Sequence, residues 1–164
     1  MYRPKLKLKK TKLEWFSDLI GAGIFIGVLV YMLSLWNELP DLVPVHFNAA
    51  GEADRWEAKS TLIVLPLIAI FTWVFMTILE RFPHIHNYPK RLNETNVRAF
   101  YLSSRKMLNV SKNICMLLFS YIVFQQVNIA RTTTDTIHPL FPVVFFAALA
   151  VPVLIHLIER RKIK

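Results

Sequence analysis

The chain has 164 residues, of which 54% are hydrophobic, and it carries a formal net charge of +9. With a mean hydropathy of +0.39, so short a chain has too small an interior to bury its apolar surface as a soluble domain. The basic residues cluster at the edges of apolar runs, as in membrane proteins, which argues against a nucleic-acid partner. The single cysteine, Cys115, excludes an intramolecular disulfide.

Four apolar segments are expected to cross a lipid bilayer, because about 20 residues of helix span a hydrocarbon core of about 30 Å. These segments are residues 15–36, 61–79, 108–130 and 139–158. The first segment follows basic residues, as the apolar core of a signal peptide does. Its apolar part is too long for such a core, so we interpret it as a retained helix. The sequence therefore predicts an all-α integral membrane protein with four transmembrane helices.

The charges on the connecting segments predict the orientation of these helices. Of the 20 lysines and arginines, 16 lie before the first span, between the second and third, or after the fourth, and Lys112 lies at the adjoining edge of the third span. The two other loops hold only Arg55, Lys59 and Arg131. By the positive-inside rule both termini are expected in the cytoplasm. The basic tails at residues 1–14 and 159–164 either contact anionic headgroups or serve only to orient the chain.

The first span contains a GxxxG motif, formed by Gly23 and Gly27. Small residues at this spacing let two helix backbones approach closely in lipid. We expect the motif to pack within the bundle, and a homo-oligomer contact is the alternative.

The loop at residues 39–59, expected outside the cytoplasm, is the least generic stretch of the chain. Apolar Val43, Val45 and Phe47 alternate with other residues, and a period of two predicts an extended segment with one apolar face. Pro44 argues against a central sheet strand, and we expect no second strand to follow.

The second half of this loop is expected to return to the membrane. Gly51 is expected to supply a positive φ, and Asp54 to bind backbone groups of the turn. The candidate partner-binding residues of the loop have directional chemistry or a fixed backbone: Pro44, His46, Asn48, Gly51, Asp54, Trp56 and Lys59.

The chemistry of the loop favours structure or recognition over catalysis. His46, Asn48 and Asp54 are candidate metal ligands, but three groups of mixed type do not define a metal site. No serine or cysteine nucleophile accompanies His46, and the chain has no glycine-rich phosphate loop. We therefore predict a protein that is not an enzyme and needs no metal or cofactor. A hydrogen-bonded structural cap is favoured, and recognition of a partner or peptide stays open.

The segment at residues 81–106 is expected on the cytoplasmic side. Its first part is expected to be extended, and it carries a second group of candidate residues: Pro83, His84, Asn87, Tyr88 and Pro89. His84 and His86 would point to one side, without a third ligand for a metal. From about Asn93 the pattern predicts a short amphipathic helix that lies on the membrane or runs into the third span.

The third span is the polar one. Asn109, Asn113 and Ser120 recur near the helical repeat, and Lys112 is expected to snorkel toward the headgroups. Such a stripe either bonds neighbouring helices or lines a wet pathway, and we favour bonds between helices. We expect no acidic residue in the middle of the membrane.

The pattern Pro-Val-His-Phe-Asn-x-x-Gly-x-x-Asp-x-Trp-x-x-Lys in this chain resembles the signature of a bacterial membrane domain of unknown function. That domain is best known from the N-terminal part of the sporulation-delaying-toxin immunity proteins. Residues 83–89 are similar to a second signature of the family, and the resemblance covers about residues 15–110. It implies a multi-pass protein of the bacterial cytoplasmic membrane. In the immunity proteins it further implies protection against a secreted peptide toxin, with signalling to a membrane-recruited repressor.

The chain is accordingly divided into a basic tail, a family-like membrane domain at residues 15–110, helices three and four at residues 108–158, and a second basic tail. The leading hypothesis is a non-enzymatic, immunity-like protein whose outer loop binds a peptide or membrane-protein partner. The alternative is a small subunit of a membrane transporter or other membrane complex.

Overall fold

The computed structural model describes residues 3–132 and 134–164. The described residues form four helices that are long and apolar enough to cross a membrane. This confirms the four predicted spans. The helices are α1 (Lys12–Ser34), α2 (Val64–Glu80, preceded by the short 3-10 turn η1 at Lys59–Ile63), α3 (Val97–Arg131) and α4 (Phe141–Arg161).

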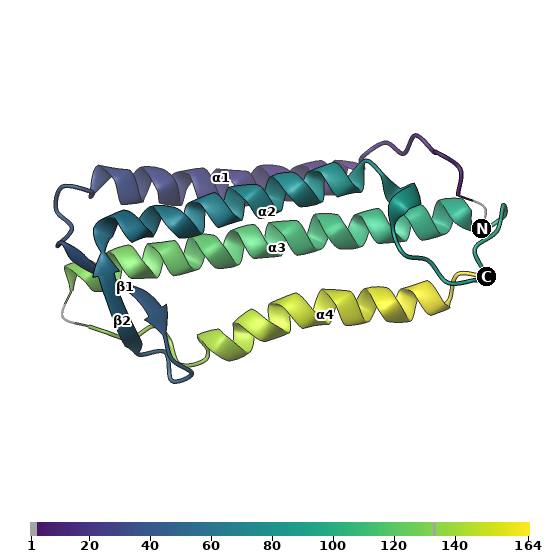
Figure 1. The fold of residues 1–164 in the computed structure, drawn as a ribbon. Coiled ribbons are helices and arrows are strands. Elements are labelled where there is room, and N and C mark those ends of the chain that lie inside the picture. Colours follow the sequence, from purple (N-terminus) through teal and green to yellow (C-terminus); the bar gives the residue numbers. More distant parts are fainter. Residues whose placement is uncertain (1–2, 133) are drawn as a thin grey trace.

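The two ends of the bundle differ in structure (Figure 1). The described N-terminal segment and the C-terminal residues lie at one end, called here the terminal end. The other end carries a β-hairpin and the connection between α3 and α4, and is called the hairpin end.

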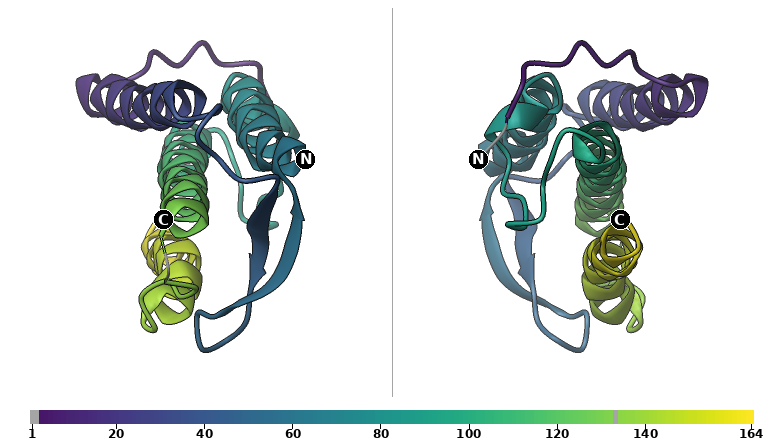
Figure 2. Two further views of the ribbon diagram at one scale, coloured as in Figure 1. Left: turned by 90° about the vertical axis from the view of Figure 1, so that its left-hand side faces the viewer. Right: turned by 90° about the vertical axis from the view of Figure 1, so that its right-hand side faces the viewer.

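Helix α3 is the centre of the bundle, and the other three helices pack on it. Seen along the bundle, α3 lies between α4 on one side and α1 and α2 on the other (Figure 2). Most of the buried polar side chains belong to α3, whereas α1, α2 and α4 expose many large apolar side chains. A bundle with polar groups inside and an apolar surface is suited to lipid rather than to water.

The segment at residues 81–106 differs from the prediction in where its helix begins and in the shape of its first part. The predicted helix runs into the third span, which is one of its two expected courses, since α3 is one continuous helix of 35 residues, and it begins at Val97 rather than near Asn93. Asn93 instead closes a turn before the helix, where its Oδ1 accepts the backbone N–H groups of Thr95 and Asn96. The part expected to be extended contains a 3-10 turn, η2 (Pro83–Ile85).

The loop at residues 39–59 forms a hairpin, so the prediction that no second strand follows is wrong. Strand β1 (Leu42–Phe47) pairs antiparallel with β2 (Ala53–Ala58), and Pro44 lies opposite Trp56. The sheet has two strands, so each strand keeps one unpaired edge, where the missing N–H of Pro44 is tolerated.

Two apolar clusters fix the loops at the ends of the bundle. At the hairpin end, Val43 of β1 is fully buried in a cluster with α1 and α3. The other members of this cluster include Met32, Leu39, Leu62, Val123 and Val127. At the terminal end, Tyr88 and Leu92 pack against the first turns of α3, including Phe100 and Tyr101.

The GxxxG motif does not pack within the bundle, which contradicts that prediction. A Cβ added at Gly23 or Gly27 would meet no other atom within 4 Å. Gly21 is the glycine that permits close approach, because a Cβ there would lie 2.7 Å from Oδ1 of Asn113 on α3. The motif residues therefore face the surroundings of the bundle, and the oligomer alternative stays open.

Candidate functional site

The turn of the hairpin depends on glycine for two separate reasons. Gly51 has a φ of 85°, which confirms the predicted positive φ. A Cβ at this position would also lie 2.8 Å from the carbonyl oxygen of Ile137, in the connection between α3 and α4. Here the backbones pair, since Ile137 N–H donates to Gly51 O and Ala53 N–H donates to Asp135 O. The hairpin is thereby tied to the start of α4.

Asn48, and not Asp54, holds the backbone of the turn. Its Oδ1 accepts the N–H groups of Ala50 at 2.9 Å and of Glu52 at 3.0 Å. Asp54, which was expected to do this, contacts His46 instead, with 2.5 Å between Oδ1 and Nδ1. The His46 and Asp54 side chains are 58% and 43% exposed, so this pair is available to a partner.

The remaining loop residues hold the hairpin to the bundle. Pro44 is buried beside Val43, whereas Trp56, its partner across the hairpin, is 41% exposed. Lys59 closes the loop, because its backbone N–H donates to Asp41 O at 2.9 Å and its Nζ lies 3.5 Å from Leu39 O. Of the loop residues, His46, Asn48, Asp54 and Trp56 are thus at least partly accessible.

A pocket of about 710 Å³ lies beneath the hairpin. Its walls come from β1, from the first turns of α2, from α3 and from the start of α4. The lining is mainly apolar, with aromatic rings from Phe47, Phe141 and Phe145, and the polar side chains of His46 and Asn48 contribute to its wall from the hairpin. A pocket of this size and character is typical of ligand-binding sites.

One buried polar group in the wall of this pocket has no partner. Gln126 of α3 lines the pocket and is 4% exposed, and its Oε1 accepts no hydrogen bond among the described residues. A buried amide oxygen without a donor costs about 1–3 kcal/mol. A ligand N–H or O–H group that reached this oxygen would remove this cost.

A second polar cluster, the buried ionic network, joins three helices near the terminal end. The Lys112 side chain is 0% exposed, and its Nζ lies 2.8 Å from Glu80 Oε1 and 3.1 Å from Asp18 Oδ1. Lys10 of the N-terminal segment pairs with the same two carboxylates. Lys112 therefore does not snorkel, contrary to the prediction, because two buried acids compensate its charge.

Amide side chains complete this network. Asn109 Nδ2 donates to Asp18 Oδ1 at 2.9 Å, and Asn113 Nδ2 donates to the same oxygen at 2.8 Å. One turn closer to the terminal end, Arg105 forms a bidentate pair with Glu14. The bonds between helices that we favoured for the polar stripe are thus present at Asn109 and Asn113, whereas Ser120 bonds only within α3, to Met116 O.

The second group of candidate residues forms a compact turn at the terminal end. Tyr88 is buried, its hydroxyl donates to Pro83 O at 2.8 Å, and its ring packs on Phe100 and Tyr101. Burial raises the pKa of Tyr88 to about 12. His84 packs edge-on against Phe82, and Asn87 and Pro89 line a second, smaller pocket together with Tyr88.

His84 and His86 do not form a pair. The two ring nitrogens of His86 contact Ser104 Oγ at 2.7 Å and Leu79 O at 3.0 Å, so both are occupied. In the described part of the chain, no three histidine, cysteine or carboxylate side chains are grouped as metal ligands would be.

Comparison with known proteins gives a partial match. A family model described as "Domain of unknown function (DUF1648)" matches residues 23–70, which comprise the second half of α1, the hairpin and the start of α2. The turn at residues 83–89 lies outside that match. An uncharacterized protein of Archaeoglobus fulgidus is 33% identical over 86 residues, which are 48% of this chain and 42% of the relative. The chain thus spans less than half of that relative's length. No solved structure matches.

Proposed function

We propose that this chain is a non-enzymatic, multi-pass membrane protein that binds a peptide segment in the pocket beneath the hairpin. The observation that carries the proposal is the unpartnered Oε1 of Gln126 in the wall of a mainly apolar pocket of about 710 Å³, to which the hairpin also contributes His46, Asn48 and Arg55. An extended or helical peptide offers what this wall lacks, because it combines apolar side chains with backbone or side-chain N–H donors.

The proposed orientation places this pocket on the outer side of a cell membrane. The hairpin end carries few of the basic residues, and the terminal end carries most of them, so the positive-inside rule puts both termini in the cytoplasm. A secreted peptide that enters the outer leaflet would then reach the pocket between the hairpin, α2 and α4. Sequestration of such a peptide is an immunity-like function and needs no catalytic group.

Site-specific photo-crosslinking in intact cells tests the proposal. A photoreactive phenylalanine analogue at Phe145, which lines the pocket, is compared with one at Phe71, which is 70% exposed on α2. We expect a peptide adduct at position 145 but only lipid adducts at position 71. The peptide adduct should decrease when Gln126 is also replaced by leucine, which has no acceptor. Lipid adducts alone at both positions would contradict the proposal.

A second candidate function, a subunit of a larger membrane complex, is favoured by the outer surfaces of α1 and α4. Gly23 and Gly27 face open space on α1, and His156 is the only described residue of α4 that is buried. Another helix could approach closely at either surface. Replacement of Gly27 by leucine should then reduce the mass of the assembly in mild detergent, whereas an unchanged monomeric mass would reject this function.

A further inference from the structure

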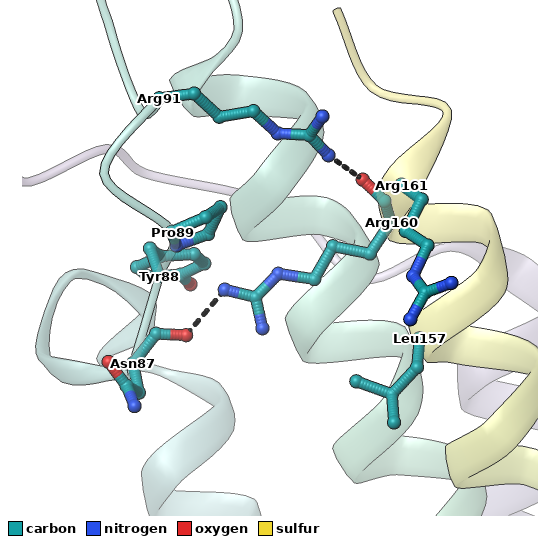
Figure 3. Close-up of a pocket in the computed structure, with 7 residues that line it drawn as sticks. All are labelled: Asn87, Tyr88, Pro89, Arg91, Leu157, Arg160 and Arg161. Carbon is teal, nitrogen blue, oxygen red and sulfur yellow. Dashed lines mark hydrogen bonds between the residues drawn. The ribbon is translucent and has the colours of Figure 1, made fainter.

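A pocket of about 400 Å³ at the terminal end is lined by three arginines and by no carboxylate (Figure 3). It lies between the turn at residues 87–91 and the last turns of α4. Its lining consists of Asn87, Tyr88, Pro89, Arg91, Leu157, Arg160 and Arg161. None of these arginines pairs with an acidic side chain anywhere in residues 3–132 and 134–164. Three arginines therefore line this pocket without an acidic partner among the described residues.

The guanidinium groups of Arg91 and Arg160 are held in place by uncharged partners. Arg160 donates to Asn87 O at 2.6 Å, and Arg91 donates to Arg160 O at 2.6 Å (Figure 3). The Arg160 guanidinium also lies 5.2 Å from the ring centre of Tyr88 and 5.6 Å from that of Phe100. Each guanidinium has five N–H donors, so these contacts orient the groups and leave further donors for a ligand.

The position of the pocket on α4 indicates where its ligand comes from. Leu157 belongs to the lining, and it lies on a helix whose side chains Leu154 and Ile158 are more than half exposed. The arginines thus stand where an apolar, lipid-facing helix surface ends. An anion at this level would have apolar surface on one side of it, as the phosphate of a membrane lipid does.

We propose that this pocket binds the phosphate group of an anionic phospholipid, with the acyl chains along Leu157 and the outer surface of α4. Arginine suits phosphate because its planar group donates two parallel hydrogen bonds to phosphate oxygens. Basic pockets between transmembrane helices are suited to anionic headgroups on the cytoplasmic side. This inference does not depend on the peptide pocket, which lies at the opposite end of the bundle.

Lipid titration of the full chain, purified in neutral detergent, tests the inference. Retention of phosphatidylglycerol and of phosphatidylcholine is measured by native mass spectrometry, and sodium phosphate is added as a competitor. We expect phosphatidylglycerol to be retained in preference to phosphatidylcholine and to resist millimolar phosphate. Displacement by phosphate would show that the pocket takes the free anion and would overturn the lipid assignment. Equal retention of the two lipids would overturn the site.

Matched variants separate the pocket from general surface charge. Arg161→Gln removes one pocket arginine that makes no hydrogen bond or ring contact with another described residue, so folding should be unaffected. Its affinity for phosphatidylglycerol should fall about fivefold, since one basic residue near a membrane surface contributes about 1 kcal/mol. Arg98→Gln removes an exposed charge from α3 outside the pocket and should leave the affinity nearly unchanged. Equal losses in both variants would overturn the inference.

Discussion

Lys112 and Glu80 form a buried ion pair, with 2.8 Å between Nζ and Oε1 and side chains that are 0% and 1% exposed. They lie on different helices, α3 and α2, and Asp18 of α1 contacts the same ammonium group. The positive charges of Lys10 and Lys112 therefore balance the negative charges of Asp18 and Glu80 inside the bundle. The arrangement holds three helices in register at the terminal end.

Removal of Lys112 should strongly destabilise the bundle. In Lys112→Met, two buried carboxylates keep only Lys10 as a counter-charge, and loss of one partner of a buried ion pair costs about 3–5 kcal/mol. Unfolding by a denaturing detergent, followed by circular dichroism, measures the change. Lys106→Met, an exposed position on the same helix, is the control. Equal stability of the two variants would mean that the network does not hold the helices together.

The turn at Gly51 should not tolerate a side chain. Gly51→Ala places a Cβ 2.8 Å from Ile137 O at a φ of 85°, and the left-handed backbone alone costs about 1 kcal/mol or more. Hydrogen exchange at the Ile137 amide, which donates to Gly51 O at 2.8 Å, should become faster. Gly23→Ala, with open space around it, should leave that amide protected. Unchanged exchange in Gly51→Ala would contradict the pairing.

The exposed pair of His46 and Asp54 should matter for binding rather than for stability. Both side chains are more than 40% exposed, and such a pair contributes about 0–1 kcal/mol. His46→Ala should therefore keep normal protein levels and reduce the peptide adduct at position 145. Loss of the protein itself would instead assign the pair to the structural cap that the sequence favoured.

The stability of the terminal end should depend on pH through His86. Burial lowers the pKa of His86, and the charge of His84 adds to this effect. Since Leu79 O can only accept, Nε2 must carry the proton of the neutral ring, and Nδ1 then accepts from Ser104 Oγ. The folded state thus binds fewer protons than the unfolded state below the ordinary pKa of about 6.5.

Stability should consequently fall as the pH decreases below about 6.5 toward the lower pKa of the folded state. Thermal unfolding of the full chain between pH 7 and pH 5 measures this slope. His86→Gln should flatten it, whereas His84→Gln should retain most of it. A slope that is the same in wild type and His86→Gln would assign the pH dependence to other groups.

The sequence predicted the helices better than the contacts between them, for physical reasons. Hydropathy depends on local composition, so the four spans could be placed. Strand β2 was missed because Ala53–Ala58 does not alternate apolar and polar residues, and its pairing depends on the turn at Gly51 and on Ile137, far along the chain.

The ionic network was missed because its partners are distant in sequence. Asp18 and Asn113 are 95 positions apart, and each lies near the end of its apolar run, where a polar residue usually faces the headgroups. Arg105 and Lys112 indicated positions at the membrane surface, but both are buried against Glu14, Asp18 and Glu80. One signal in the sequence could have identified the network. Asp18 and Glu80, near the ends of the first two spans, lie at the same end of the bundle as Lys112 in the third span.

Lys10 should react more slowly with an amine-specific reagent than its neighbour Lys9. Although burial opposes the charged form, hydrogen bonds and charges from Asp18 and Glu80 raise the pKa of Lys10, so less of the reactive neutral amine is present. Lys9 is exposed and serves as the internal control. Glu80→Gln removes one of the two carboxylates that contact Lys10 and should increase its labelling relative to Lys9. Equal labelling of both lysines in wild type, measured by mass spectrometry, would show that the N-terminal segment is not anchored in the network.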